Sequence, residues 1–417
     1  MSSKKKILIY LFFVLSLLTG YFFNENASGG AELDQTFLKP FIQKFSINFF
    51  TGMDFYLNND GSKIHSPAFY LIIAPLLTLF QNFNAVNIFY LLICSLLPYI
   101  FFLVLKNKTK SNSGYIFLVS ILIFISPYFR SSAIWMLGDN LSLLFFCVSI
   151  YFYSKIENDK KNFLYYFLCL FFLICCCYIR YYYAVFYLFY IFYFYNKISV
   201  IQFTYLIIFS FLISIPALYY FYYIFIEYNF GKVLNNYTHL INFYSNTLQI
   251  LSILFFYLFP FVVLRLFNFI SYYKNNLKII NIFFLVVSSF LLVDTFIYEN
   301  LINISISGGG IFKKLAELLD FSIPVILSFF SLISLLILDF VFKENRVHNY
   351  ILLIILITCF PLTIIYQKYL DPLFFLFFFG LVRSNFILDA LLKRYTPIIF
   401  LFIYFGSFLL FSIIYYN

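Results

Sequence analysis

Long apolar runs separated by short polar segments repeat from one end of the chain to the other. One further apolar run, 67–80, is short and contains Pro67 and Pro75, so we predict that it is re-entrant at one membrane face. Only helices satisfy all their own backbone hydrogen bonds within a single segment that crosses a bilayer. The pattern therefore predicts an all-α polytopic membrane protein, with about thirteen transmembrane helices at 7–23, 86–105, 114–129, 140–153, 163–179, 181–196, 199–224, 249–270, 279–298, 322–342, 350–366, 372–384 and 396–415.

The composition agrees with this class. The 417 residues are 64% hydrophobic and only 11% charged, whereas a soluble domain has about 25% charged residues. We expect the lipid bilayer as a partner and no nucleic acid. All seven cysteines lie inside apolar runs, where a thiol acts as a small hydrophobic group, so we predict neither disulfides nor a zinc site.

Basic residues predict the topology. If 67–80 does not cross the membrane, 17 of the 27 Lys and Arg residues fall on the side of the N-terminus, which is then cytoplasmic by the positive-inside rule. Most acidic residues fall on the outer side, so we expect any chemistry there. The prediction is one domain, 1–417, with outer loops at 24–85, 225–248 and 299–321, and with no soluble domain.

The first outer loop contains the strongest candidate for a catalytic residue. The stretch "AELDQTFLKPFIQKF" predicts an amphipathic interfacial helix with Phe37, Phe41 and Phe45 on one face. Partial dehydration of Asp34 near the bilayer would raise its basicity, which suits a general base. The alternative is a solvated acid at the start of a helix.

Basic residues follow in the same loop. Lys63 and His65 precede Pro67, which we expect to open the apolar helix at the membrane surface. These two side chains either bind a substrate or act as ordinary interfacial anchors.

Three later segments add charge on the outer side. Arg130 and Trp135 are predicted in a short outer loop, with Asp139 at the head of the next span, either as a capping acid or as a substrate ligand. Arg180 interrupts two apolar runs, as a turn marker or as an anion-binding group.

Late in the chain, Lys368, Tyr369 and Asp371 lie at the mouth of another outer hairpin. The stretch "ISGGGIFKKLAELLD", 305–320, predicts a glycine-rich loop followed by a short amphipathic helix. Carboxylates and cations gathered at one membrane surface suit transfer of a group from a lipid-linked phosphate, because a base activates the acceptor and cations stabilise the departing phosphate.

The order of these features resembles the GT-C glycosyltransferases, in the bacterial branch near protein mannosyltransferases, aminoarabinose transferases and the RgtA/B/C/D-like group. Gln35 and Ser66 depart from the family's usual Glu and Pro. The matching positions are Asp34-Gln35 for the Asp-Glu pair, His65-Ser66-Pro67-Ala68 for the (H/K)PPL-type sequence, Asp139 for the acid opening a span, Ile179-Arg180 for the arginine hairpin, and Lys368-Tyr369-Leu370-Asp371-Pro372 for the late element.

This resemblance implies sugar transfer from a polyprenyl-phosphate donor to an envelope glycan, lipid or protein, at the periplasmic face of a bacterial inner membrane. It implies Asp34 as the base, with Asp139, Arg180, Lys368, Tyr369, Lys63 and His65 binding substrate. The residues include no metal-binding motif, although two acids leave a divalent ion as an open alternative. Competing interpretations are an O-antigen polymerase or ligase, and a transporter using Arg265, Asp294 or Asp339.

Overall fold

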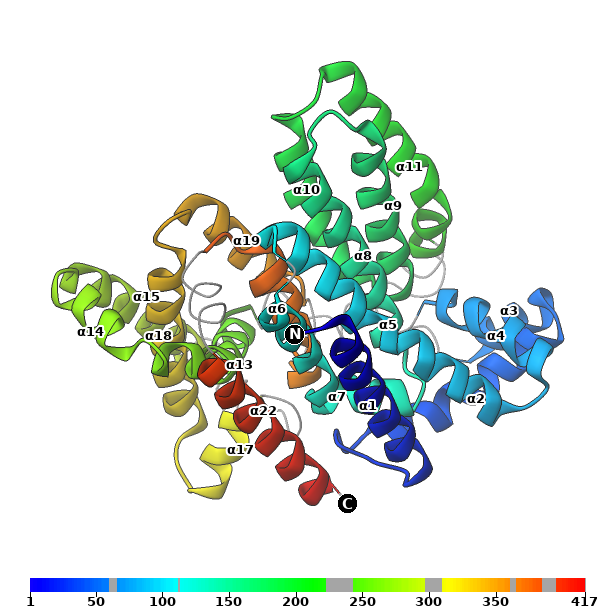
Figure 1. Cartoon of the computed structure of the whole chain (residues 1–417), viewed down its shortest axis with the longest axis horizontal. Helices are drawn as coiled ribbons and strands as arrows, with labels where there is room; N and C mark the ends of the chain where they lie inside the picture. The colour runs from blue at the N-terminus through cyan, green and yellow to red at the C-terminus, as the bar shows by residue number, and fades with distance from the viewer. Residues whose placement is uncertain are drawn as a thin grey trace. The chain divides into compact units, whose positions relative to one another are not determined.

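The computed structural model describes residues 1–59, 66–111, 113–222, 243–296, 310–360, 365–384 and 395–416. Every regular element in these ranges is helical, which confirms the all-α class. The chain divides into two compact units, residues Met1–Tyr228 with Phe402–Asn417, and residues Asn229–Leu401. Figure 1 labels their helices.

The first unit begins with one long helix and then three short ones. Its elements are α1 (Ser3–Phe22), α2 (Ala31–Ile47), α3 (Phe49–Asn58), α4 (Ala68–Phe80), α5 (Phe83–Thr109), α6 (Gly114–Ile121), the 3-10 helix η2 (Leu122–Ile125), α7 (Pro127–Ile134), α8 (Gly138–Asn158), α9 (Phe163–Ile179), the 3-10 helix η3 (Tyr181–Val185), α10 (Phe186–Tyr195), α11 (Val200–Tyr222) and the end of α22 (Tyr395–Tyr416).

Helices α8 and α9 form an antiparallel hairpin, labelled in the upper part of Figure 1. Ser149 Oγ donates to the Cys169 carbonyl at 2.8 Å, and Ser142 Oγ to the Cys176 carbonyl at 3.3 Å. Small hydroxyl residues at such an interface allow close packing and hydrogen bonding between helices. This register places the N-terminus of α8 beside the C-terminus of α9.

The predicted amphipathic helix of the first outer loop is confirmed as α2. Its buried face includes Leu38, Phe41 and Phe45, whereas Phe37 is exposed. This buried face packs against α3 and α4. The prediction for 67–80 as a short separate helix is also confirmed, since α4 has only 13 residues and Pro67 is its N-cap.

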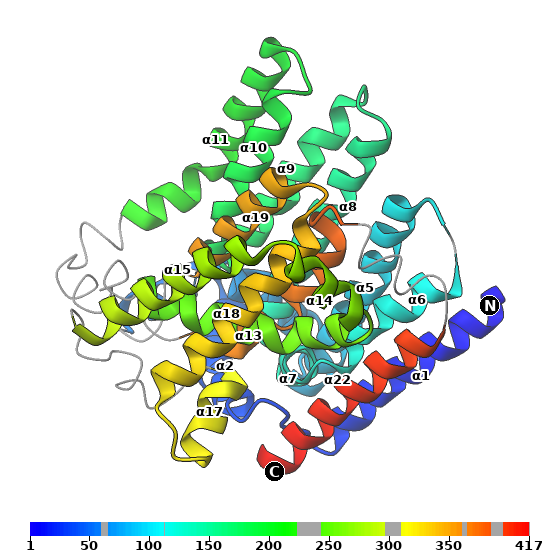
Figure 2. The ribbon, with the colours of Figure 1, turned by 90° about the vertical axis from the view of Figure 1, so that its left-hand side faces the viewer.

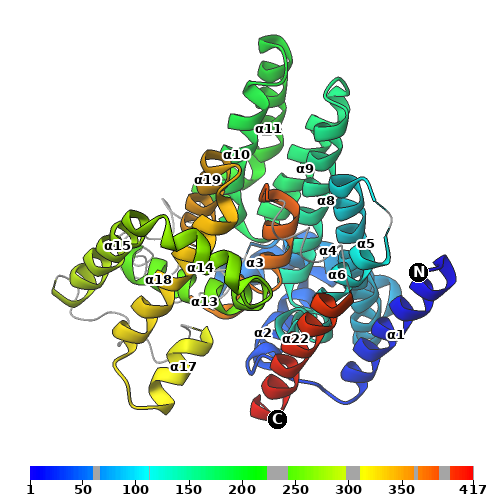
Figure 3. The same cartoon turned by 60° about the vertical axis from the view of Figure 1, so that its left-hand side comes forward.

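The second unit packs around α13, α15 and α18, and α17 lies against the N-terminal half of α18 in Figure 3. The amphipathic helix predicted after the glycine run is confirmed as α17. The elements are α13 (Phe243–Val263), α14 (Leu266–Lys274), α15 (Leu277–Phe296), α17 (Gly310–Leu318), α18 (Ile323–Phe342), α19 (Arg346–Thr358), the 3-10 helix η5 (Gln367–Tyr369), α20 (Leu373–Phe375), the π-helix η6 (Leu376–Leu381) and the start of α22.

Two predicted boundaries around α13 are wrong. The span predicted at 249–270 is broken at Arg265, which is the N-cap of α14 and not part of a continuous span. Its helix α13 already begins at Phe243, so the last residues of the predicted outer loop 225–248 are helical and mostly buried. The polar residues Ser245, Asn246 and Thr247 made this segment resemble a loop in the sequence.

Among the described residues, six helices are long and apolar enough to cross a membrane. The number rises to eight if each of two bent pairs forms one span, one of them combining Gly114–Ile125 with Pro127–Ile134 at 63°. The chain is thus a helical protein with several candidate membrane spans. The full count of thirteen stays a prediction.

Candidate functional site

An ion pair between Asp139 and Arg180 forms the centre of the candidate site, in the first unit. Arg180 Nη2 donates to Asp139 Oδ2 at 2.8 Å, and Nε lies 2.8 Å from Oδ1. The two side chains are 17% and 18% exposed, so both are largely shielded from the surroundings. A two-point contact of this kind fixes the plane of the guanidinium as well as its position.

The α8–α9 hairpin explains why the two residues meet. Asp139 lies in the first turn of α8, and Arg180 is the C-cap of α9. A carboxylate is favoured at a helix N-terminus and a cation at a C-terminus, because each opposes the local helix dipole. Both dipoles therefore support the charges that the ion pair brings together.

The first turn of α4 closes one side of this junction. A Cβ atom on Gly138 would lie 3.3 Å from the ring of Phe69 and 3.2 Å from Ile179 Cγ2. The absence of a side chain at Gly138 therefore lets α4 and the end of α9 approach the start of α8. Tyr90 of α5 fixes the same turn by donating its hydroxyl to the Leu137 carbonyl.

Tyr70 of α4 lies within reach of the positive charge of Arg180. Its ring is fully buried and stacks on Phe41 and Phe45 of α2, with centroids 5.2 and 6.0 Å away. Its hydroxyl has no hydrogen-bond partner within the described part of the chain. Burial raises the pKa of Tyr70, and the nearby positive charge of Arg180 acts in the opposite direction. A buried phenol beside a guanidinium offers a second donor to a bound oxyanion.

Tyr70 was not among the predicted site residues. It is one of 39 tyrosines and lies inside an apolar run. The only signal in the sequence was its position just after "HSPAF".

Asp34 is exposed and lies on α2. It lies in the first turn of α2, two turns before the buried Phe41. The neighbouring Gln35 ties this part of α2 to α5, because its Nε2 donates to Asn87 Oδ1 at 3.1 Å. The base role of Asp34 stays a prediction.

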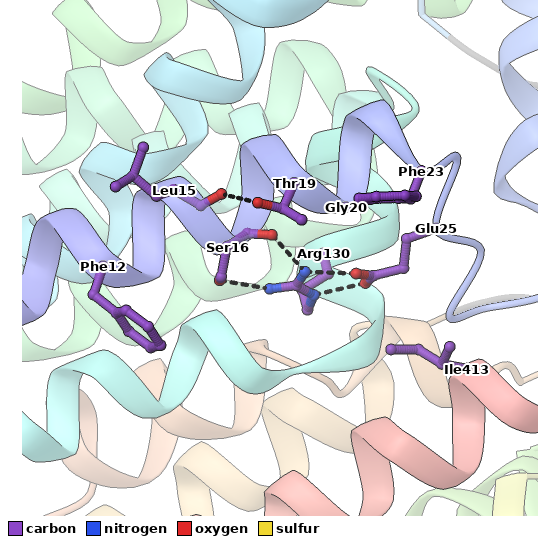
Figure 4. A pocket seen from close by; sticks show the side chains of 9 residues that line it. All are labelled: Phe12, Leu15, Ser16, Thr19, Gly20, Phe23, Glu25, Arg130 and Ile413. Carbon is purple, nitrogen blue, oxygen red and sulfur yellow. Dashed lines mark hydrogen bonds and ion pairs between the residues drawn. The ribbon is translucent and has the colours of Figure 1, made fainter.

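The prediction that Arg130 lies in a short outer loop is wrong. Arg130 belongs to α7, and its side chain is only 7% exposed. Its Nε and Nη2 atoms donate to Glu25 at 2.6 and 2.5 Å, as Figure 4 shows. Trp135 caps α7 and donates its indole N–H to the Glu25 carbonyl. These contacts form a separate charged cluster at the end of α1.

Lys368 and Tyr369 belong to the second unit. The Lys368 ammonium lies 5.5 Å from the ring centroid of Tyr366 and 6.0 Å from that of Tyr369, which are cation–π distances. Gln367 anchors this turn by donating to the Tyr257 hydroxyl at 3.1 Å and by accepting from the Ile311 N–H at 3.1 Å. Lys63 and His65 lie outside the described residues.

Asp339, a candidate for the transporter interpretation, has a different environment. Tyr272, Tyr273 and Tyr350 all donate to its carboxylate, at 3.0, 3.3 and 2.9 Å. Arg346 lies 3.7 Å away. A buried carboxylate with this many donors is held in place by its neighbours, as expected of a structural group. The side chain of Asp294 lies outside what the structure describes.

Both carboxylate oxygens of Asp139 lie toward the guanidinium of Arg180, so a divalent metal ion there would have to share the carboxylate with that cation. Among the described residues, no group of three or more His, Cys, Asp or Glu side chains could hold a metal ion. All seven cysteines are free thiols, five of them buried.

Comparison of the chain with protein-family models, with curated proteins and with solved structures gives no match.

Proposed function

We propose that this protein is a GT-C-type membrane glycosyltransferase that uses a polyprenyl-phosphate sugar donor. The observation that supports this proposal is the shielded Asp139–Arg180 ion pair, with the buried Tyr70 hydroxyl nearby. An oriented guanidinium beside a phenol, in a chain with several candidate membrane spans, suits a phosphate attached to a lipid. The acceptor is an envelope glycan, lipid or protein at the non-cytosolic face of a bacterial inner membrane.

In the proposed reaction, Asp34 removes a proton from an acceptor hydroxyl. The acceptor oxygen attacks the anomeric carbon of the sugar, and the bond from that carbon to the phosphate oxygen breaks. The polyprenyl phosphate leaves with the bonding electrons, and the sugar inverts its configuration. Arg180 stabilises the charge that develops on the phosphate. The substrate-binding roles of Lys63, His65, Lys368 and Tyr369 stay predictions from the sequence.

The geometry gives Asp139 a narrower role than direct contact with the acceptor. Because its two oxygens face Arg180, we assign Asp139 as a positioning residue that orients the guanidinium. No metal ion takes part in this scheme.

Replacing Asp34 tests the proposal. In membranes that contain the full chain and lipid-linked sugar donors, we expect Asp34→Asn to lower the rate of sugar transfer by about 100-fold or more, the usual contribution of a general base. Glu32→Gln is the matched control, because Glu32 is an exposed acid in the same first turn of α2, and we expect it to retain the wild-type rate. Equal rates for Asp34→Asn and wild type would remove the base assignment.

A further inference from the structure

A pocket of about 460 Å³ lies in the first unit between α1, α7 and the end of α22. Figure 2 shows α1 and α22 running in the same direction. The ring centroids of Phe13 and Phe402 are 6.2 Å apart. The lining residues are Phe12, Leu15, Ser16, Thr19, Gly20, Phe23, Glu25, Arg130 and Ile413.

The lining of the pocket is apolar apart from the hydroxyls of Ser16 and Thr19 and one charged pair. Figure 4 shows Arg130 and Glu25 joined at the end of α1, with Phe12, Phe23 and Ile413 around them. Arg130 also donates from Nη1 to Ser16 Oγ at 3.1 Å and from Nη2 to the Ser16 carbonyl at 3.0 Å. With the two bonds to Glu25, these contacts use four of the five guanidinium N–H groups, and each Glu25 oxygen retains a lone pair.

The surroundings of the pocket are those of a lipid-facing surface. Both α1 and α22 are candidate spans of which only 17% and 22% are buried. Phe12 and Leu15 at the pocket, and Phe411 and Ile414 near it on α22, are 59–79% exposed. In a bilayer these side chains face hydrocarbon, so a molecule that reaches the pocket from the side is a membrane lipid.

The charge of the pair restricts which lipid head group fits. Glu25 and Arg130 together carry no net charge, and four of the five guanidinium N–H groups already have partners, so a purely anionic head group finds a single donor there. One remaining guanidinium N–H can donate to a phosphate oxygen, and the Glu25 oxygens can accept from an ammonium group. A primary ammonium donates hydrogen bonds, whereas the quaternary ammonium of a choline head group cannot.

We propose that this pocket binds one membrane lipid with a phosphatidylethanolamine-type head group. Its ammonium donates to Glu25, its phosphate accepts from Arg130, and part of one acyl chain lies among Phe12, Leu15 and Ile413. With about 30 Å³ for each water-sized group, the pocket volume holds about fifteen such groups, enough for a head group or a chain segment. This inference does not depend on the glycosyltransferase proposal.

Native mass spectrometry of the full chain in detergent tests this lipid site. The probes are phosphatidylethanolamine, phosphatidylcholine and phosphatidylglycerol with identical acyl chains, added at equal concentrations. We expect one phosphatidylethanolamine to bind at least tenfold more tightly than either of the other two lipids. Equal binding of the three lipids, or preferential binding of phosphatidylglycerol, would overturn the proposal.

Two variants locate the bound lipid. Ile413→Trp fills the pocket and leaves both residues of the ion pair in the chain, and we expect at least tenfold weaker binding of phosphatidylethanolamine. Ile414→Trp is the control, because Ile414 is 79% exposed and does not line the pocket, and we expect binding unchanged from wild type. Unchanged binding by Ile413→Trp would place the lipid elsewhere and refute this site.

Glu25→Gln tests the head-group contact, provided that this variant is monodisperse in detergent. We expect it to reduce the preference for phosphatidylethanolamine over phosphatidylcholine by at least fivefold. If Glu25→Gln fails to fold, the Ile413→Trp and Ile414→Trp pair decides the question.

Discussion

At the scale of single residues, Asp139 and Arg180 act as one unit, because they form an ion pair at the junction of α8 and α9. We expect Asp139→Asn and Arg180→Gln each to lower sugar transfer at least about tenfold, equivalent to about 1.4 kcal/mol of transition-state stabilisation. The double variant should be no worse than the poorer single variant, since residues in one network are not additive. The measurement is a double-mutant cycle on the transfer rate.

Arg180→Lys separates charge from geometry in the same cycle. Lysine keeps the positive charge but not the planar fork that contacts Asp139 at two points. We expect a loss in rate close to that of Arg180→Gln. Wild-type activity in Arg180→Lys, or fully additive losses in the cycle, would contradict the idea of a positioned guanidinium.

Gly138 gives a second prediction at this scale. Even a Cβ atom would lie 3.2–3.3 Å from Ile179 and Phe69, so the larger side chain of Gly138→Val must push α4 or α9 away from α8. Overpacking of this kind costs about 1–3 kcal/mol. We expect a lower melting temperature and slower sugar transfer for Gly138→Val. Gly406→Val is the control, because a Cβ there meets nothing within 4 Å.

Charged residues that lie in apolar stretches could be identified as candidate site residues from the sequence. Asp139 and Arg180 were both predicted as site residues, and the structure joins them. Which charges would neutralise each other could not be predicted, because Glu25 and Arg130 are more than 100 positions apart and meet only through helix packing. Tyr70 was missed because no chemical feature separates it from the many tyrosines that merely pack.

At the scale of helices, Asp339 ties the ends of three elements together. The carboxylate lies near the C-terminus of α18 and accepts from Tyr272 and Tyr273 of α14 and from Tyr350 of α19. Asp339→Asn removes the charge that these donors share. We expect it to destabilise the protein by about 2–3 kcal/mol, the size of hydrogen bonds to a charged group. The measurement is the melting temperature in detergent, which should fall.

The control for this substitution is Asp320→Asn, because Asp320 is an exposed acid beyond the end of α17. We expect its free energy of unfolding to stay within about 0.5 kcal/mol of the wild-type value, as it does for most surface substitutions. A melting temperature of Asp339→Asn equal to that of Asp320→Asn would show that the cluster does not join the helices.

The hydrophobic runs in the sequence predicted which segments are helical, but they did not predict where those helices break. The span predicted at 114–129 is not one straight helix, because the structure bends this stretch by 63° before Pro127, which opens α7. Proline at the first helical turn favours a new helix start. Arg265 marks the other break, and a single charge in an apolar run gave no indication of whether the helix continues or ends.

At the scale of the whole molecule, the topology depends on whether α4 crosses the membrane. Its 13 residues span about 20 Å as a helix, whereas the hydrocarbon core is about 30 Å thick. A helix this short, which packs against both α2 and α5, fits a re-entrant position better than a span. Both ends of α4 then lie on one side of the membrane, and α5 carries the chain across.

Single cysteines on either side of α4 test this topology in intact cells. We expect a membrane-impermeant thiol reagent to label Asn58→Cys and Asn84→Cys from the outer side, since both residues are exposed and flank α4. Lys108→Cys, at the other end of α5, should be labelled only after the membrane is opened. The wild-type chain is the control, because its seven thiols lie within helices or at their ends, and most are buried.

If Asn58→Cys and Asn84→Cys were labelled from opposite sides, α4 would cross the membrane and every later loop would change side. The basic clusters at 106–110, 155–161 and 393–394 would then face outward against the positive-inside rule. Asp139 and Arg180 would face the cytosol, where the proposed lipid-linked sugar is not used.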